Sequence, residues 1–367
     1  MRHPTPADIM ASRGGQCFHF GLEAEFLLVD AHSFHPLWHP QLRFAELNAA
    51  LESIPVADFS CEGLKVEAPH RKRMPFVVEG YHVVDADLKP IDLMPKGIEI
   101  RTPVCSSIEE CLTALRVLHE RLQRKLQELG YCAVALSFHP TEDHFEGPQN
   151  KRRYDHWQWA MEAMTTFGPD VNISLPPDLA EQLDLHELHG KVNYYAPALT
   201  ALSLASPLYR GDLWWIRGKI GKSVRTYHRS TIAPAIEIHP DENLRLEFKP
   251  LEMSGSLSDY HNYFLLWLTL ILDEGLPGRA TEQSRIYDLG RVARYGTEAE
   301  TVRERAAEIL NRAPQVLEPW GFDCAPLNAF RDRLQTGHLP SDDIIALFEH
   351  EKSIPGVLCH LADLTLA

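Results

Sequence analysis

The sequence lacks the features that mark several common classes of protein. Its seven cysteines form no CxxC pair and no zinc-type spacing, so neither a disulfide framework nor a zinc site is indicated. They stand at positions 17, 61, 105, 111, 132, 324 and 359. The longest apolar run, Tyr263–Leu272, is about half of a bilayer span. The N-terminal residues show no basic stretch followed by an apolar one. We therefore expect a cytoplasmic protein with reduced cysteines and no membrane segment.

Glycine-rich nucleotide motifs and an excess of basic residues are also missing. No GxGxxG or GxxxxGK[ST] sequence follows a predicted strand, which argues against a Rossmann or P-loop site. Lysine and arginine number 36 against 51 acidic residues, a formal net charge of -15. That sign argues against nonspecific binding of nucleic acid or an anionic membrane and suits a metal cation. With no repeat or Ser/Gly linker, residues 1–367 are expected to form one domain, with a motif-bearing core at about 18–255 and a helical part at about 256–367.

The order of the predicted elements indicates an α+β fold. Apolar and polar residues alternate over 170–175, over 244–249 and over 17–30, where an apolar run follows, and these segments predict strands. Residues 131–140 predict a further strand that runs out into a loop. Helices are predicted at 108–129 and at about 155–166, 258–274, 298–312 and 341–352. The first of these begins with the capping-box pattern Ser107-x-x-Glu110 and ends before Gly130. Because strands and helices mix without a βαβ rhythm, we expect a largely antiparallel sheet.

Four extended segments pair an apolar face with a charged face, since successive side chains of a strand point to opposite sides. The charged faces carry Glu23 and Glu25, Glu99 and Arg101, Asp170 and Asn172, and Arg245, Glu247 and Lys249. A solvent-exposed sheet face is the alternative explanation, but Asp and Glu are poor strand residues. Carboxylates that crowd together repel one another, and a divalent cation with oxygen ligands such as Mg²⁺ offsets this repulsion. Because Mg²⁺ is commonly bound together with substrate phosphates, ATP is the expected ligand. In that case Arg101, Arg225 and Lys249 would face the phosphates.

Five stretches in this order resemble the glutamate-cysteine ligase and carboxylate-amine ligase families of the glutamine synthetase superfamily. They are GLEAEF, IDLMPKGIEIRTP, SFHP with RRYDHW, FGPDVNISLP and RLEFKP, spread over about 18–255. The resemblance implies a curved, largely antiparallel sheet with helices on its outer face. It also implies ATP-dependent amide formation through an acyl phosphate, from the γ-carboxylate of glutamate and an amine such as cysteine.

The resemblance further implies roles for individual residues. The implied metal ligands, for two or three Mg²⁺ ions or for Mn²⁺, are Glu23, Glu25, Asp92, Glu99, Asp170 and Glu247. The implied nucleotide-binding or substrate-binding residues are Arg101, His139, Arg153, Tyr154 and Asn172. Arg225 and Lys249 would face phosphate or the acyl-phosphate oxygens. The implied partners are a small carboxylate and a small amine, and a homodimer is the default assembly.

Two positions depart from the family pattern. Asp170 stands where relatives carry a histidine ligand, and Lys249 stands where they carry a phosphate-contacting arginine. An aspartate still supplies an oxygen ligand for a metal ion. Lysine, however, replaces the planar guanidinium of arginine, which donates two parallel hydrogen bonds, by an ammonium that acts as a point charge. A ligase-like protein that binds metal or nucleotide without turnover is therefore one alternative. A metal-dependent hydrolase is another, although the sequence has no HxH, HxxEH or HExxH motif.

Two of the implied residues have structural alternatives. His139 is equally well explained as a capped loop histidine. Arg225 lies in the basic stretch GKIGKSVRTYHRS, which fits either a mobile loop that faces phosphate or a solvated turn.

Overall fold

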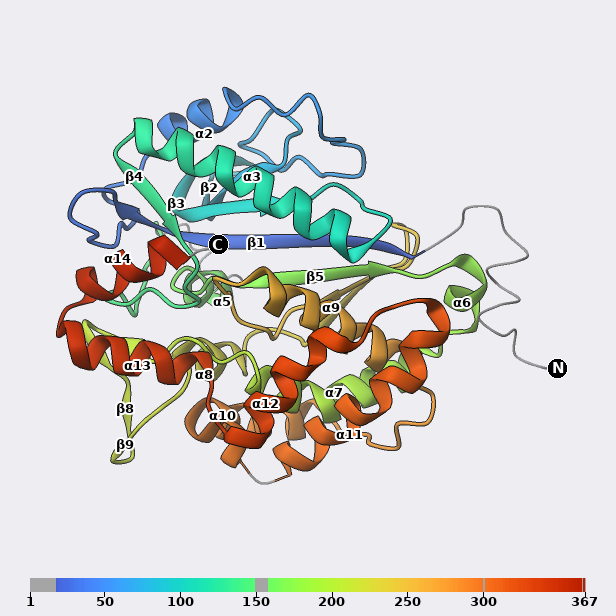
Figure 1. Cartoon of the computed structure of the whole chain (residues 1–367). Coiled ribbons are helices and arrows are strands. Elements are labelled where there is room, and N and C mark those ends of the chain that lie inside the picture. The colour runs from blue at the N-terminus through green and yellow to red at the C-terminus, as the bar shows by residue number, and fades with distance from the viewer. Residues whose placement is uncertain (1–17, 149–157, 300, 365, 367) are drawn as a thin grey trace.

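The computed structural model describes residues 18–148, 158–299, 301–364 and 366. One sheet crosses the molecule, and helices cover one of its faces (Figure 1). All neighbouring strands of this sheet are antiparallel. The predicted α+β class with a largely antiparallel sheet is therefore confirmed. The expectation that the chain is a single domain stays a prediction.

The strands of the main sheet follow the order β10-β11-β5-β1-β3-β2, and β4 pairs with the second half of β1. β1 is central because it pairs with other strands along both of its edges. β3 pairs with one edge, and the other edge pairs first with β5 and then with β4. The bounds are β1 (His19–Asp30), β2 (Phe76–Val84), β3 (Pro90–Arg101), β4 (Tyr131–Val134), β5 (Pro169–Ser174), β10 (Ile236–His239) and β11 (Arg245–Phe248).

Helices α2, α3 and α9 pack on the sheet, and α14 contacts β4. Their bounds are α2 (Phe44–Glu52), α3 (Ile108–Glu128), α9 (Leu257–Leu272) and α14 (Ile354–Leu364). The other helices are α5 (Gln158–Ala163), α6 (Pro177–Gln182), α7 (Leu185–Ala201), α8 (Val224–Arg229), α10 (Glu282–Tyr295), α11 (Val302–Leu317), α12 (Asn328–Thr336) and α13 (Pro340–Glu351). Two small hairpins pair β6 (Leu208–Tyr209) with β7 (Asp212–Leu213) and β8 (Trp215–Ile216) with β9 (Lys219–Ile220). Within the described ranges, no helix combines the length and apolar character needed to cross a membrane.

The apolar side of the sheet forms part of the hydrophobic core. The alternate β1 residues Phe20, Leu22, Ala24 and Phe26 are at most 2% exposed. The ring of Phe20 meets Phe264 of α9 edge to face, with the ring centres 5.7 Å apart. Burying this face drives the sheet against the helices. The same alternation turns the charged residues of each strand toward the opposite side.

Helix α3 begins nearly as predicted. The Ser107 hydroxyl accepts a hydrogen bond from the Glu110 backbone N–H. The Glu110 carboxylate, however, accepts from the backbone N–H of Ser106 instead of that of Ser107. Gly130, with φ of +77°, follows the helix and ends it in the left-handed conformation that glycine favours. These caps set where α3 begins and ends.

Candidate active site

The register of the central strands gathers the predicted charged residues on one face. Glu23 of β1 lies opposite Arg101 of β3 on one side and Asp170 of β5 on the other. Glu25 lies opposite Glu99. One strand further along the sheet, Asn172 lies opposite Glu247. Carboxylates that are far apart in the sequence thus form a continuous polar surface across four strands, β3, β1, β5 and β11.

Two cavities open on this polar face. The larger, about 930 Å³, is lined on its acidic side by Glu25, Glu79 and Glu99. The smaller, about 430 Å³, lies toward the start of β1 and is lined by residues that include Glu23 and Glu247. With the exception of Asp92, the carboxylates implied by the resemblance are therefore not dispersed over the outer surface.

Glu25, Glu79 and Glu99 form the clearest place for a metal ion. Each offers a carboxylate oxygen within 4.8 Å of the others. Burial, and then repulsion by Glu99 and Glu25, raise the pKa of Glu79 well above its ordinary value. At Glu25 burial acts in the same direction, but Lys96 at 2.9 Å outweighs it and lowers the pKa. A hard divalent cation with oxygen ligands, such as Mg²⁺, fits this donor set.

Glu23 lines the smaller cavity and has no cation closer than 3.9 Å among the described residues. Its nearest ion-pair contact is to Arg245, at 3.9 Å. Burial, followed by repulsion from Glu99, raises the pKa of Glu23 to about 8, although Arg101 acts against this. Carboxylates this crowded need additional positive charge to remain ionised at neutral pH.

The other end of the polar face is already supplied with protein cations. The Lys249 ammonium lies 2.8 Å from Asp170 Oδ2 and in direct contact with Glu247. Burial alone would raise the pKa of Glu247, but Lys249 and Arg245 lower it to about 2. The structure brings Asp170, Glu247 and Lys249 together, and it places Lys249 among the carboxylates.

Arg225 lies in neither a loop nor a solvated turn. It belongs to α8, whose first turn is capped by the Ser223 hydroxyl, and its side chain is 1% exposed. Its guanidinium donates only long hydrogen bonds, to the carbonyls of Lys249 at 3.2 Å and Pro250 at 3.4 Å, and its Nε has no partner among the described residues. Burial, and then Arg229 one turn away, lower the pKa of Arg225 to about 10, so it stays charged at neutral pH.

Arg225 and Arg229 both line the larger cavity. Arg229 donates to the Thr166 hydroxyl at 3.2 Å. Within the described part of the chain, neither guanidinium forms an ion pair with a carboxylate. Two positive groups without a negative partner, facing a cavity, form a suitable site for an anion.

Two predicted residues lie away from this site. Asp92 is exposed and seven residues from Glu99 along β3, which is roughly 23 Å at the rise of a strand. His139 is buried, and its ring nitrogens face the Leu37 carbonyl and the Glu142 backbone N–H. Burial lowers the pKa of His139 to about 4, although the contact with Leu37 acts against this. His139 therefore fits the description of a capped loop histidine, and we leave both residues out of the proposed site.

Arg101 and Asn172 line the smaller cavity. Arg101 contacts Glu99 and donates to the Lys65 carbonyl at 3.4 Å, while Asn172 accepts from Arg245 at 2.5 Å. The remaining two predicted residues, Arg153 and Tyr154, lie outside the described residues.

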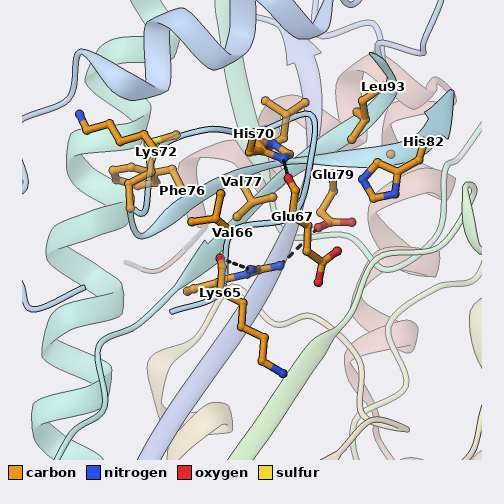
Figure 2. A pocket seen from close by; sticks show the side chains of 14 residues that line it. Lys65, Val66, Glu67, His70, Lys72, Phe76, Val77, Glu79, His82 and Leu93 are labelled. Carbon is orange, nitrogen blue, oxygen red and sulfur yellow. Dashed lines mark hydrogen bonds and ion pairs between the residues drawn. The ribbon is translucent and has the colours of Figure 1, made fainter. Parts of the chain in front are cut away.

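The loop before β2 contributes to the lining of both cavities. Figure 2 shows Lys65 and Glu67 on this loop, together with the side chain of Glu79 on β2. The Lys65 side chain forms an ion pair with Glu242, which lies between β10 and β11. Glu67 lines both cavities. The loop thus spans the polar face from β2 toward the opposite edge of the sheet.

Several site residues were missed by the sequence reasoning. The strand sequence AIEIH places Glu237 between apolar neighbours, in the same alternation that identified the other strands, and applying that criterion to 236–239 would have found it. Glu79 lies in the strand FVVEGYHVV, whose apolar residues do not alternate, so the same criterion does not find it. Lys96 and Arg229 carry no comparable signal, because only the tertiary structure turns them toward Glu25 and the larger cavity.

Solved structures identify the fold. A bifunctional glutathione synthetase from Pasteurella multocida matches with a TM-score of 0.63 and 16% identity, over 95% of this chain and 52% of that one. A glutamate-cysteine ligase from Francisella tularensis, solved in complex with AMP, matches with a TM-score of 0.61 and 12% identity, over 96% of this chain and 88% of that one. The chain therefore has the fold of the glutamine-synthetase-like ligases.

The sequence comparison defines the family. The profile of glutamate-cysteine ligase family 2 matches residues 19–231, more than half of the chain. This chain belongs to that family. A protein named "Putative glutamate--cysteine ligase 2" from Rhodospirillum rubrum is 31% identical over 121 residues, 31% of this chain and 30% of that protein. One of the same name from Leptothrix cholodnii is 24% identical over 189 residues, 50% of this chain and 48% of that protein. The matches thus span less than half the length of both relatives.

Proposed function

We propose that this chain is an ATP-dependent carboxylate-amine ligase that forms an amide through an acyl phosphate. The observation that carries the proposal is the larger cavity, whose lining combines three carboxylates with the buried Arg225 and the half-buried Arg229. A place for a divalent cation beside unpaired positive charge suits a nucleoside triphosphate. Family membership supports the reaction class, and the Francisella tularensis neighbour was solved with AMP.

The reaction proceeds in two displacements. A substrate carboxylate oxygen attacks the γ-phosphorus of ATP, the bond from this phosphorus to the β-γ bridging oxygen breaks, and ADP leaves. The amine nitrogen then attacks the acyl carbon, the carbon-oxygen bond to phosphate breaks, and the amine loses a proton. Following the family name, we propose the γ-carboxylate of glutamate as donor and an amine such as cysteine as acceptor.

The residues of the larger cavity would mainly fix charges in place. Glu25, Glu79 and Glu99 would hold Mg²⁺, or Mn²⁺, and this ion would offset the charge of the phosphates. Arg225 and Arg229 would donate to the phosphoryl oxygens that gain charge during transfer. Because these groups are already positioned by α8 and by three strands, little reorganisation is needed at the moment of reaction.

The smaller cavity would hold part of the carboxylate or amine substrate. Arg101 and Asn172 line it, and it adjoins the larger cavity at Glu237, which lines both. A volume of about 430 Å³ is within the usual range for a small-molecule site. Its lining is rich in charged groups of both signs, which suits a zwitterionic substrate.

The test is ADP and phosphate release from Mg-ATP and glutamate across a panel of amines that begins with cysteine. Amine-dependent release in the wild type, lost in Glu99→Gln and retained in the exposed control Glu62→Gln, is expected. Phosphate release that needs no amine would favour a hydrolase. No release with any amine, despite nucleotide binding, would mean a ligase-like protein without turnover.

A further inference from the structure

One protein cation lies among three carboxylates at the β5, β11 and β10 end of the polar face. The Lys249 ammonium is 2.8 Å from Asp170 Oδ2, touches Glu247 Oε1, and is 3.8 Å from Glu237 Oε2. The Lys249 side chain is only 14% exposed. The three acidic residues come from three adjacent strands, and Glu237 lies directly opposite Glu247.

The second oxygen of Glu247 also has protein partners. Glu247 Oε2 accepts from Arg245 at 2.7 Å and lies 2.9 Å from His239 Nε2. The donor atoms of Glu237, His239 and Glu247 lie within 4.8 Å of one another, close enough to share one metal ion. The carboxylates are therefore arranged as for a divalent cation, but the place between them and Asp170 is taken by an ammonium group.

The Glu25, Glu79 and Glu99 group differs in this respect. Lys96 contacts Glu25, and Arg101 contacts Glu99 while remaining 4.0 Å from Glu79. Among the described residues, no single cation is shared by all three carboxylates. Oxygen atoms therefore remain available there for a metal ion.

We propose that the Lys249 ammonium permanently replaces a divalent cation between Asp170, Glu237 and Glu247. Divalent cations on the polar face are then confined to the Glu25, Glu79 and Glu99 side. The inference rests on the proposed function only where it assigns a metal ion to Glu25, Glu79 and Glu99. It follows that removing the ammonium converts the Lys249 end into an additional metal site, with three carboxylates and one imidazole. That mixed oxygen and nitrogen donor set favours Mn²⁺ over Mg²⁺.

The experiment counts Mn²⁺ ions bound per nucleotide-free chain, from the electron paramagnetic resonance signal of free Mn²⁺ during a titration. Lys249→Met is expected to bind one more ion than the wild type. Asp170→Asn/Lys249→Met, which removes a carboxylate together with the ammonium, is expected to bind the extra ion at least tenfold more weakly. Lys125→Met makes the same charge change on α3, at a half-buried position paired with Glu128, and should leave the count unchanged.

Two further measurements keep the test decisive. If Lys249→Met does not fold without metal, Mn²⁺ should restore its cooperative melting, and the neutral but hydrogen-bonding Lys249→Gln variant replaces it in the count. Equal counts in the wild type and the folded Lys249 variants would overturn the inference. A lower count in the single variant Asp170→Asn than in the wild type would also overturn it, because Asp170 would then already be a ligand. Failure of the ligase assay with every amine would refute the proposed function but would not alter these counts.

Discussion

The Arg225 guanidinium lies directly against Gly168. A Cβ atom added at position 168 would come within 2.0 Å of Arg225 Nη2. The backbone N–H of Gly168 also donates to Glu25 at 2.9 Å. Gly168 therefore separates the acidic and basic sides of the larger cavity and leaves no room for a side chain.

Gly168→Ala is expected to displace the Arg225 guanidinium and to lower amine-dependent phosphate release at least tenfold, because misplacing a charge-stabilising group by about 1 Å has effects of this size. Steady-state kinetics with Mg-ATP measure the change. The control is Gly290→Ala in α10, where an added methyl makes only an ordinary contact with Arg294 at 3.7 Å. Equal rates for Gly168→Ala and the wild type would show that Arg225 is not positioned for this reaction.

Replacing Glu79 or Glu99 by Gln is expected to weaken Mn²⁺ or Mg²⁺ binding at least tenfold, since each substitution removes one charged oxygen ligand from the group formed with Glu25. Isothermal titration calorimetry on the nucleotide-free chain measures the dissociation constant. The exposed control Glu62→Gln should bind like the wild type. An unchanged constant in both site variants would place the metal elsewhere.

The buried His119 is expected to make stability depend on pH below neutrality. Burial lowers its pKa from the ordinary 6.5 to about 4, and its ring lies against Phe26, with the ring centres 5.0 Å apart. The stabilisation is fully present above pH 6.5 and is lost as pH falls toward 4, because the unfolded chain binds the proton first. A shift of this size corresponds to about 3 kcal/mol.

Chemical denaturation at several pH values measures this dependence. His119→Leu should flatten the slope between pH 6.5 and 4, leaving the part contributed by other groups such as His139. His35→Leu, at an exposed position, should retain the wild-type slope. Identical slopes in all three proteins would contradict the prediction.

Glu252 is expected to be important for stability, because it holds the start of α8 in place. Its fully buried carboxylate accepts from the hydroxyls of Ser223, Ser206 and Thr226 and from the backbone N–H of Ala205 at 2.7 Å. Glu252→Gln presents an amide donor to groups that are themselves donors, and we expect a loss of about 2 kcal/mol in the free energy of unfolding.

Since α8 carries Arg225, ligase turnover of Glu252→Gln should also fall, even at temperatures where the variant is fully folded. Urea denaturation and kinetics on the same preparation separate the two effects. Glu128→Gln, on the exposed face of α3, is the control. Wild-type stability in Glu252→Gln would argue against this role.

The sequence by itself determined which residues face the polar side of the sheet. Alternation of apolar and charged residues is a local property of an extended chain, so the pattern alone assigns Glu23 and Glu25 to one face. The start and end of α3 could likewise be predicted from local sequence, because Ser107 caps the start and Gly130 ends the helix. The family followed from the order of the same short segments.

Only the tertiary structure decided which of these residues meet. Register between strands distant in sequence placed Glu79 beside Glu25 and Glu99, and it placed Glu237 opposite Glu247. It also left Asp92 far along the β2-β3 hairpin, which carries register shifts of its own. Register depends on burial and turn geometry across the whole sheet, and no local pattern encodes it. For the same reason Lys249, which the sequence placed on the polar face, became the partner of Asp170 only in the assembled sheet.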